Sequence, residues 1–281
     1  MKFSKIKSYA KINLALNVIG KKTNLHKIES IVSFIELHDE VFIRPIHSNN
    51  HKIYFKGKFA KNIYKKNTVS CLMKILEKKK ILINKKFEIK IIKNIPQKAG
   101  LGGGSMNASV LINYFLKKKY ISLYKKRLLD LTNSIGSDVI LGVIQKNTVL
   151  SSNGKIRKFK KNLNLHVLVL KPNFGCSTKN IYSQVKYFSK PLFLRPKKSL
   201  FNLDNIKDSK NDLERIVLQK YPTFKRLKLY LDGLPNIIFS RMTGSGSSII
   251  AYFHSKRDVD KAAKKIQRNY SNYWCITSKT I

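Results

Sequence analysis

The chain has 281 residues, enough for one large domain or two medium ones with a buried core. Apolar residues make up 43% of it and aromatic residues 10%, which excludes an intrinsically disordered protein. Lysine and arginine number 57 against 15 aspartates and glutamates, a formal net charge of +42. Such an excess indicates either a nucleic-acid or membrane-surface partner, or a solvated surface of lysines. Because the lysines are spread along a chain also rich in Ile, Asn, Tyr and Phe, we favour drift toward AT-rich codons. We therefore expect no specific nucleic-acid partner and no membrane partner.

In chain order, the first basic stretch "MKFSKIKSYAK" and the following "INLALNVIG" resemble a signal peptide. Two asparagines interrupt the apolar part and no small-residue cleavage site follows, so we interpret this region as a strand. The N-terminal half predicts strands over residues 7–19, 40–46 and 86–94, and helices over 67–80, 105–118 and 124–135. The loop "RPIHSNNH" holds His47 and His51, with His38 upstream; we interpret them as solvated loop histidines and expect no protein metal site.

The C-terminal half begins after a predicted hairpin turn at Asn153-Gly154. It predicts a strand over 164–170, a helix after Ser177, helices within 209–231, a strand over 236–241, another strand after "TGSGSS", a helix over 257–268 and a closing strand. Strands and helices mixed in two successive blocks predict an α+β fold of two domains, residues 1–150 and 151–281.

The cysteine pattern and the length of the apolar runs indicate the cellular compartment. Cys71, Cys176 and Cys275 are odd in number, widely spaced and form no CxxC pair, which argues against a disulfide framework or a zinc site. No apolar run reaches the roughly 20 residues of a membrane span. We expect a cytoplasmic protein.

The stretch "IPQKAGLGGGSMNAS" places four of the 13 glycines within five residues. Clustered glycine lets the backbone approach a ligand closely or adopt a positive φ. Because the loop lies between a predicted strand and a predicted helix, its N–H groups and the helix dipole favour a bound phosphate. Neither G-x-x-x-x-G-K-[ST] nor a dinucleotide G-x-G-x-x-G with a distant acid is present, and a flexible turn or tight packing loop is the alternative.

Two charged residues elsewhere in the chain also stand out; Lys11 is of interest only if its strand face borders the glycine loop. Strand alternation in "AKINLALNVIG" places Lys11, Asn13 and Asn17 on one face, which taken alone is expected to be an ordinary solvent-facing surface. Asp138, in "NSIGSDVILGV", is a rare acid among apolar residues, and a buried carboxylate needs a partner. Lys11 could be that partner; an N-cap or turn aspartate is the alternative.

Five segments in order resemble the GHMP small-molecule kinases: "AKINLALNVIG", "PQKAGLGGGS", "IGSDV", "NDLE" and "MTGSGSS". The form "GLGGGSMNAS" is most similar to the branch that phosphorylates methylerythritol linked to cytidine diphosphate, in the non-mevalonate route to isoprenoid precursors. The resemblance implies an N-terminal ATP-binding α/β domain and a C-terminal ferredoxin-like domain. It also implies ATP with Mg²⁺ as cofactor, and transfer of the γ-phosphoryl group to the 2-hydroxyl of this small-molecule substrate.

The resemblance assigns roles to individual residues. Asp138 matches the acid that accepts the proton of the attacking hydroxyl, and Lys11 matches the lysine that pairs with it and steadies developing charge. The nucleotide-side positions are Pro96, Gly100, Leu101, Gly102, Gly103, Gly104, Ser105 and, as a weaker match, Asn67. The substrate-side positions are Asn13, His26, Tyr182, Gly244 and Gly246, with Tyr182 as an aromatic that stacks on cytosine.

Two departures from the family pattern affect the expected affinity. The segment "TNLH" has Leu25 where the family has a stacking tyrosine, and a lost stack is worth roughly 1–3 kcal/mol. Met106 replaces a serine after the glycines and removes a hydroxyl near the phosphates. Two alternatives stay open: another GHMP kinase, or a non-catalytic basic RNA-binding protein, against which the presence of Lys11 and Asp138 argues.

Overall fold

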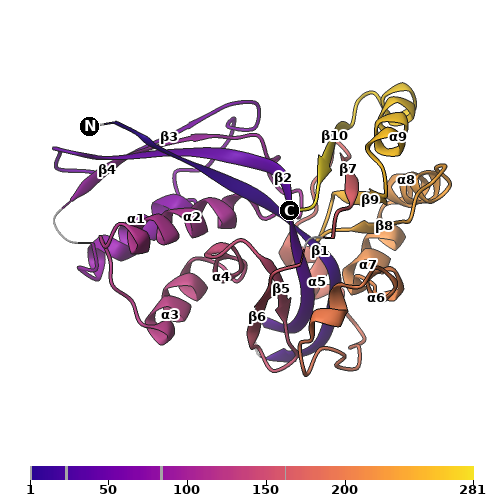
Figure 1. Cartoon of the computed structure of the whole chain (residues 1–281), viewed down its shortest axis with the longest axis horizontal. Helices are drawn as coiled ribbons and strands as arrows, with labels where there is room; N and C mark the ends of the chain where they lie inside the picture. Colours follow the sequence, from indigo (N-terminus) through magenta and orange to yellow (C-terminus); the bar gives the residue numbers. More distant parts are fainter. Residues whose placement is uncertain (1, 23–24, 83–84, 162) are drawn as a thin grey trace. The chain divides into compact units, whose positions relative to one another are not determined.

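The computed structural model describes residues 2–22, 25–82, 85–161 and 163–281 (Figure 1). The chain packs as two compact units. The first comprises Met1–Lys11, Leu37–Gln97 and Gly102–Gln145, and the second comprises Ile12–Glu36, Lys98–Leu101 and Lys146–Ile281. Two long strands, β1 (Ser4–Lys22) and β2 (Leu25–Ile46), continue from one unit into the other. The units therefore do not follow the continuous division at residue 150, which stays a prediction about sequence domains. Residues 23 and 24 of the "TNLH" segment lie outside the described residues.

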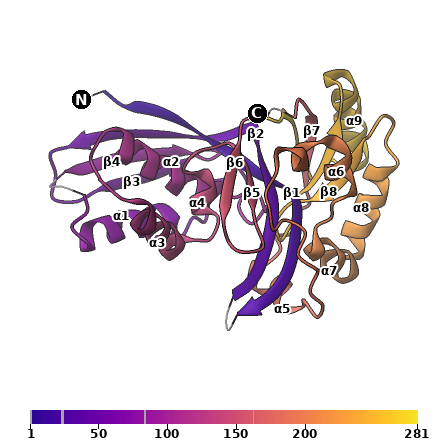
Figure 2. The same cartoon turned by 60° about the horizontal axis from the view of Figure 1, so that its bottom comes forward.

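The first unit is a sheet with helices on one face (Figure 2). Strand β4 (Lys86–Ile92) lies between β3 (Lys52–Lys56), to which it is parallel, and the C-terminal part of β2, to which it is antiparallel. The helices are α1 (Thr68–Lys78), α2 (Gly103–Lys117), α3 (Lys125–Ile135) and the short α4 (Val139–Gly142). Alternate residues of β4, such as Phe87, Ile89 and Ile91, pack against Leu111 and Phe115 of α2 in a fully buried core.

The second unit contains a four-stranded antiparallel sheet in the order β10–β7–β9–β8. In chain order these are β7 (His166–Lys171), β8 (Phe239–Met242), β9 (Ile249–Phe253) and β10 (Trp274–Lys279). Helices connect β7 to β8, and α9 (Lys256–Asn269) connects β9 to β10. This β-α-β-β-α-β arrangement is the ferredoxin-like split βαβ pattern, which confirms the predicted fold class.

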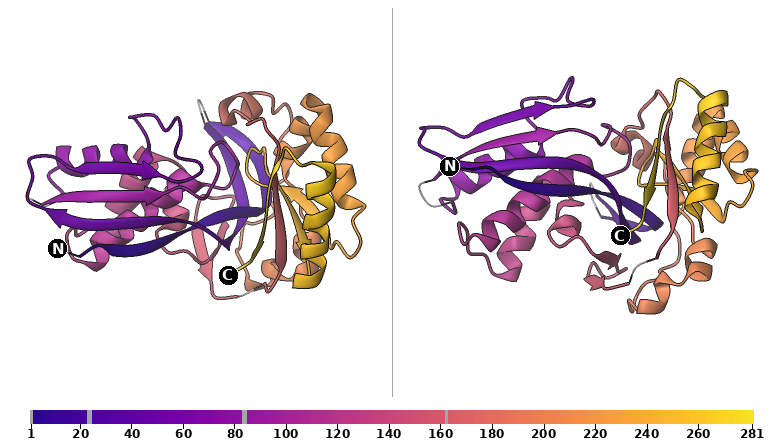
Figure 3. Two further views of the ribbon diagram at one scale, coloured as in Figure 1. Left: turned by 90° about the horizontal axis from the view of Figure 1, so that it is seen from above. Right: turned by 45° about the horizontal axis from the view of Figure 1, so that its top comes forward.

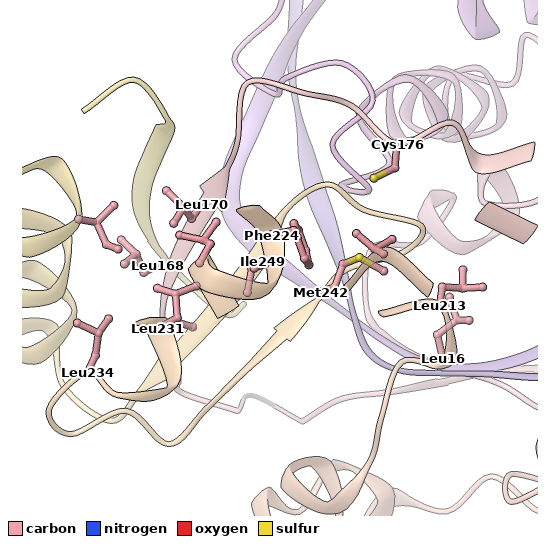
Figure 4. Close-up of a cluster of buried hydrophobic side chains, with 14 of the residues drawn as sticks. Leu16, Leu168, Leu170, Cys176, Leu213, Phe224, Leu231, Leu234, Met242 and Ile249 are labelled. Atoms are coloured by element: carbon pink, nitrogen blue, oxygen red, sulfur yellow. The ribbon is translucent and has the colours of Figure 1, made fainter. Parts of the chain in front are cut away.

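One face of that sheet is covered by α8 (Pro222–Asp232) and α9 (Figure 3). The core beneath them joins strand residues such as Leu168, Met242 and Ile249 to Phe224 and Leu231 of α8, and it also contains Leu213 (Figure 4). The remaining helices between β7 and β8 are α5 (Thr178–Ser183), η1 (Lys198–Phe201), α6 (Leu203–Asp208) and α7 (Asp212–Lys220). The predicted hairpin at Asn153-Gly154 is present, because β5 (Asn147–Leu150) pairs antiparallel with β6 (Ile156–Phe159) around it.

Four local features differ from the predictions. Strand β2 begins at Leu25, not at residue 40 as predicted. The earlier part was missed because Glu29–Ile35 are buried on both faces and show no alternation of polar and apolar residues. Strand β3 was missed, and so was α6. His51 is not solvated: its side chain is only 6% exposed, and its Nδ1 accepts a hydrogen bond from the backbone N–H of Phe87 at 2.9 Å. Burial lowers the pKa of His51 below its ordinary value.

The described residues contain neither a cluster suited to a metal ion nor a helix suited to a membrane. No three histidines, cysteines or acids in this part of the chain are grouped so that they could hold a metal ion. Likewise, no helix within it combines the length and apolarity that crossing a membrane requires.

Candidate active site

The first unit brings Lys11 and Asp138 together. Lys11 Nζ lies 3.3 Å from Asp138 Oδ2, with the lysine side chain 4% exposed and the aspartate side chain 34% exposed. Asp138 precedes α4 but, within the described structure, makes no side-chain capping bond to it, so the N-cap alternative is not supported. A buried ammonium is thus fixed against a carboxylate that a ligand can still reach.

The polar face of β1 is buried, so the expectation of a solvent-facing surface was wrong. Lys11, Asn13 and Asn17 are 3%, 4% and 2% exposed. Each is satisfied inside the protein: in the second unit, the side-chain amide of Asn13 donates to Ser30 Oγ at 2.9 Å, and that of Asn17 donates to Glu29 Oε1 at 2.8 Å. Buried polar groups require such partners, and the local sequence pattern could not show that these partners are present.

Helix α2 begins within the glycine loop, directly beside Lys11. The N-cap residue Gly102 has φ 69°, and no side chain among the described residues caps the helix. The first intrahelical bond runs from Met106 N to Gly102 O at 2.9 Å, so the N–H groups of Gly103, Gly104 and Ser105 precede it. A Cβ at Gly102 would lie 2.7 Å from Lys11 Cγ, so only glycine allows this approach. An uncapped helix N-terminus next to an ammonium is a site for an anion.

Asp39 organises the entrance to this loop, and the sequence analysis missed it. It is fully buried in β2, and its Oδ1 accepts hydrogen bonds from the backbone N–H groups of Asn94 (2.7 Å) and Ile95 (2.8 Å). Its Oδ2 accepts from Lys93 Nζ and, at 3.0 Å, from Asn107 Nδ2 of α2. One carboxylate therefore ties β2 to the chain that enters Pro96 and to the first turns of α2. No local signal marked it, because Asp39 stands between His38 and Glu40, directly before the predicted strand over 40–46.

The second unit holds the other part of the glycine loop against a second glycine loop. Gly100 has φ 73°, and a Cβ there would lie 2.1 Å from the carbonyl oxygen of Thr243. Thr243 Oγ1 accepts from Asn13 N at 2.9 Å, and Ser248 N donates to Ala99 O at 3.3 Å. The segment Lys98–Leu101, in which Leu101 is buried, is thus packed onto the "MTGSGSS" loop.

The "NDLE" motif positions that second loop. Asn211 Nδ2 donates to the carbonyl oxygens of Met242 and Gly244, both at 2.8 Å, and Glu214 accepts from Met242 N. Gly244 and Gly246 both have positive φ, 56° and 85°. The "NDLE" and "MTGSGSS" motifs, some thirty residues apart in sequence, are therefore hydrogen-bonded to each other within this unit.

An aromatic pair lies in the same unit. The rings of His26, in β2, and Tyr182, in α5, have centroids 5.1 Å apart and an interplanar angle of 38°. Burial, and secondly the charge of Lys21, lowers the pKa of His26 below its ordinary value. Both causes favour the neutral imidazole.

Comparison with known proteins decides the family. Residues 67–147 match the GHMP kinases N terminal domain. A 4-diphosphocytidyl-2-C-methyl-D-erythritol kinase of Pelagibacter ubique (strain HTCC1062) is 59% identical over 277 residues, 99% of this chain and 99% of that protein. The chain belongs to the GHMP kinase family. It is an ATP-dependent small-molecule kinase, and the resemblance inferred from five motifs is confirmed.

More distant relatives agree with this. A protein of the same name from Petrotoga mobilis (strain DSM 10674 / SJ95) is 30% identical over 87% of this kinase and 96% of its own length. A crystal structure of 4-(cytidine 5'-diphospho)-2C-methyl-D-erythritol kinase has a TM-score of 0.77 at 20% identity, covering 98% of this chain and 99% of the other. Homoserine kinase from Cytophaga hutchinsonii has a TM-score of 0.67 at 17% identity, covering 99% of this chain and 94% of the other, so the fold is that of the family.

One residue of this kinase that was predicted to bind the nucleotide caps a helix. Asn67 is the N-cap of α1: its Oδ1 accepts from Val69 N (3.0 Å) and Ser70 N (3.1 Å), while its Nδ2 donates to Tyr64 O at 3.0 Å. Its neighbour Thr68 donates to Gly104 O at 2.7 Å and so links α1 to the start of α2. The amide of Asn67 is therefore engaged in capping, and an adenine contact stays a prediction.

We expect Asn67→Ala to lower the free energy of unfolding by about 1 kcal/mol, because the side-chain acceptor for Val69 N and Ser70 N is lost, while the backbone N–H of residue 67 can still donate to Ser70 Oγ. Urea unfolding followed by circular dichroism measures this. Lys66→Ala, a substitution of an exposed residue in the loop that precedes α1, is the control. A loss no larger than that of the control would show that the cap is unimportant. A raised KM for ATP at unchanged stability would instead support an adenine contact.

Proposed function

We propose that this kinase transfers the γ-phosphoryl group of ATP to the 2-hydroxyl of 4-diphosphocytidyl-2-C-methyl-D-erythritol. The observation that carries the proposal is the Lys11–Asp138 ion pair (3.3 Å) packed against the glycine N-terminus of α2. Full-length identity of 59% to a relative named for this substrate supports the choice within the family.

In the proposed reaction, Asp138 accepts the proton of the attacking hydroxyl. The Asp138 carboxylate is partly exposed, and Lys11 contacts it through Oδ2. The other oxygen, Oδ1, can therefore receive the proton of a substrate hydroxyl. Lys11 holds the carboxylate in place and stabilises negative charge that develops on the transferred group.

The nucleotide phosphates would be held by the N–H groups of Gly103, Gly104 and Ser105 at the start of α2. The uncapped helix N-terminus fits such an anion. Mg²⁺ would come with the nucleotide and neutralise phosphate charge, and the two nearby acids, Asp39 and Asp138, are each already paired with a lysine. We therefore expect phosphate oxygens to supply most of its ligands.

On the substrate side, we propose that His26 and Tyr182 receive the cytosine, with Asn13 and the Gly244–Gly246 loop near the sugar alcohol. The support is the aromatic pair at 5.1 Å and the bond from Asn13 N to Thr243 in the second glycine loop. A cytoplasmic location and the absence of a nucleic-acid partner stay predictions.

The decisive experiment is ADP release by the purified protein with 4-diphosphocytidyl-2-C-methyl-D-erythritol, beside mevalonate, homoserine and galactose. Turnover with the cytidyl substrate alone is expected. Turnover with one of the other three would move the protein to another branch of the family. Absence of turnover with all four in a folded protein would favour the non-catalytic alternative, which salt-dependent RNA binding would then test.

Leu25→Tyr should lower the KM for the cytidyl substrate by about 10-fold, because an aromatic ring stacks on cytosine where leucine cannot. The site can accept a larger side chain, since Leu25 is 77% exposed. Steady-state kinetics at saturating ATP measure the effect, and Leu25→Met is the control for size without a ring. An unchanged KM would mean that cytosine does not lie beside Leu25.

A further inference from the structure

Lys98 has a left-handed backbone conformation, which is unfavourable for lysine. Its φ is 52° in the middle of "PQKAG". Two other lysines have positive φ, Lys80 (50°) and Lys119 (56°), but each directly follows the C-cap residue of a helix, where this conformation is usual. Lys98 follows no helix: it lies between the end of β4 and the start of α2. A left-handed residue other than glycine costs free energy, and such strain clusters at functional sites.

The stem of Lys98 rests on another glycine. A Cβ at Gly175 would lie 3.0 Å from Lys98 Cβ and 3.5 Å from its Cδ, so a larger residue there would displace the lysine. Both residues belong to the second unit, and Lys98 is exposed. Its aliphatic stem is thus held while its ammonium stays accessible.

Three segments of the second unit meet around Lys98. The segment that contains Gly175 lies against the second glycine loop, since Ser247 Oγ donates to Phe174 O at 2.6 Å and Thr178 Oγ1 lies 2.9 Å from Ser245 Oγ. The residue after Lys98 is bound to the same loop through Ser248 N and Ala99 O at 3.3 Å. The Lys171 ammonium is engaged by the carbonyl oxygen of Phe174 at 3.2 Å. The surroundings therefore offer hydroxyls, glycine backbone and the exposed ammonium of Lys98.

No acid of these segments opposes that ammonium. The sequence has no aspartate or glutamate between Asp138 and Asp204, nor between Asp232 and Asp258. Both segments that meet Lys98 fall within these acid-free stretches. An exposed ammonium among hydroxyls and backbone N–H groups, with no acid in the neighbouring segments, is suited to binding an anion.

The adjoining helix indicates which anion. Helix α5 begins at Thr178 and carries Tyr182, whose ring pairs with His26. Under the proposed function this pair receives cytosine, and the substrate carries a diphosphate directly attached to its cytidine. We infer that Lys98 binds the diphosphate of the substrate, an inference that rests on the proposed function and adds a specificity-determining residue to it. ATP, the other phosphate source, is assigned to the start of α2, and its binding by Lys98 is an outcome of the test.

Lys98→Gly removes the ammonium without adding backbone strain, because glycine adopts positive φ freely. We expect the KM for the cytidyl substrate to rise by about 10-fold or more, with the KM for ATP and kcat unchanged and Tm unchanged or raised. Lys98→Arg, which keeps the cation, should restore the KM to within about 3-fold. Lys80→Gly and Lys119→Gly are matched controls, which relieve the same strain and should leave both KM values unchanged.

An unchanged substrate KM in Lys98→Gly would overturn the inference, and so would a rise confined to the KM for ATP. Binding of cytidine diphosphate without ATP, measured by calorimetry, distinguishes this failure from that of the proposed function. Wild-type binding that weakens about 10-fold in Lys98→Gly upholds the role of Lys98 even where turnover is absent. Equal binding by the two proteins, or no binding by the wild type, contradicts it.

Discussion

Asp138→Asn should lower kcat for ADP formation by about 10²- to 10⁴-fold, the contribution expected of a general base. Asparagine preserves shape but cannot accept the hydroxyl proton. Because the Asp138 side chain is 34% exposed, the substitution should leave the fold intact. Steady-state kinetics and a thermal melt of the same preparation measure the two effects. Asp130→Asn, in the exposed surface of α3, is the matched control and should leave kcat unchanged.

Lys11→Met tests the other half of the pair. Methionine keeps the buried stem that packs on Gly102 but removes the ammonium, so we expect a loss of kcat of similar size. The double variant should be hardly worse than either single variant, because residues that act as a unit are not additive. A single variant that keeps more than about a fifth of the wild-type kcat would exclude Asp138 as the base or Lys11 as its partner.

The pair could be predicted because the local sequence indicates that Asp138 needs a partner, and the resemblance to the GHMP kinases selects Lys11. In a chain with only 15 acids, an aspartate amid apolar residues requires a partner, and a lysine on a regular strand is a natural one. The glycine loop was predictable for a similar reason, since a strand and a helix flank it. The structure adds that the helix starts at Gly103, two residues earlier than predicted, so the glycines form its first turn.

What the sequence could not show are the long-range contacts. Asn13 meets Thr243, 230 residues away, and so a face that looks like a solvent-facing strand is buried. The N-terminal part of β2 lacks alternation because it is covered on both sides, and periodicity fails for such strands. The packing units differ from the sequence blocks because β1 and β2 are long enough to belong to both.

Asp39→Ala should lower the free energy of unfolding by about 3–5 kcal/mol, the cost of leaving a buried ammonium without its counter-charge. Lys93 is 5% exposed, and the N–H groups of Asn94 and Ile95 would also lose their acceptor. Urea unfolding monitored by circular dichroism measures the change. Glu40→Ala is a control in the next residue of the same strand. Glu40 pairs with Lys5 at 2.5 Å on the surface, a contact worth about 0–1 kcal/mol.

The same network predicts a functional effect that a stability defect alone does not produce. Asp39→Asn keeps one acceptor oxygen for Asn94 and Ile95 but loses the charge opposite Lys93, so the protein should fold while the loop that enters Pro96 shifts. We expect its KM for ATP to rise more than its KM for the cytidyl substrate, because Asn107 and Lys93 connect Asp39 to the start of α2. Equal changes in the two KM values, or a stability loss in Asp39→Ala no greater than in Glu40→Ala, would mean that the phosphate loop holds its shape without Asp39. The geometry argues otherwise, since a single carboxylate there accepts four hydrogen bonds from two segments of the chain, residues 93–95 and α2.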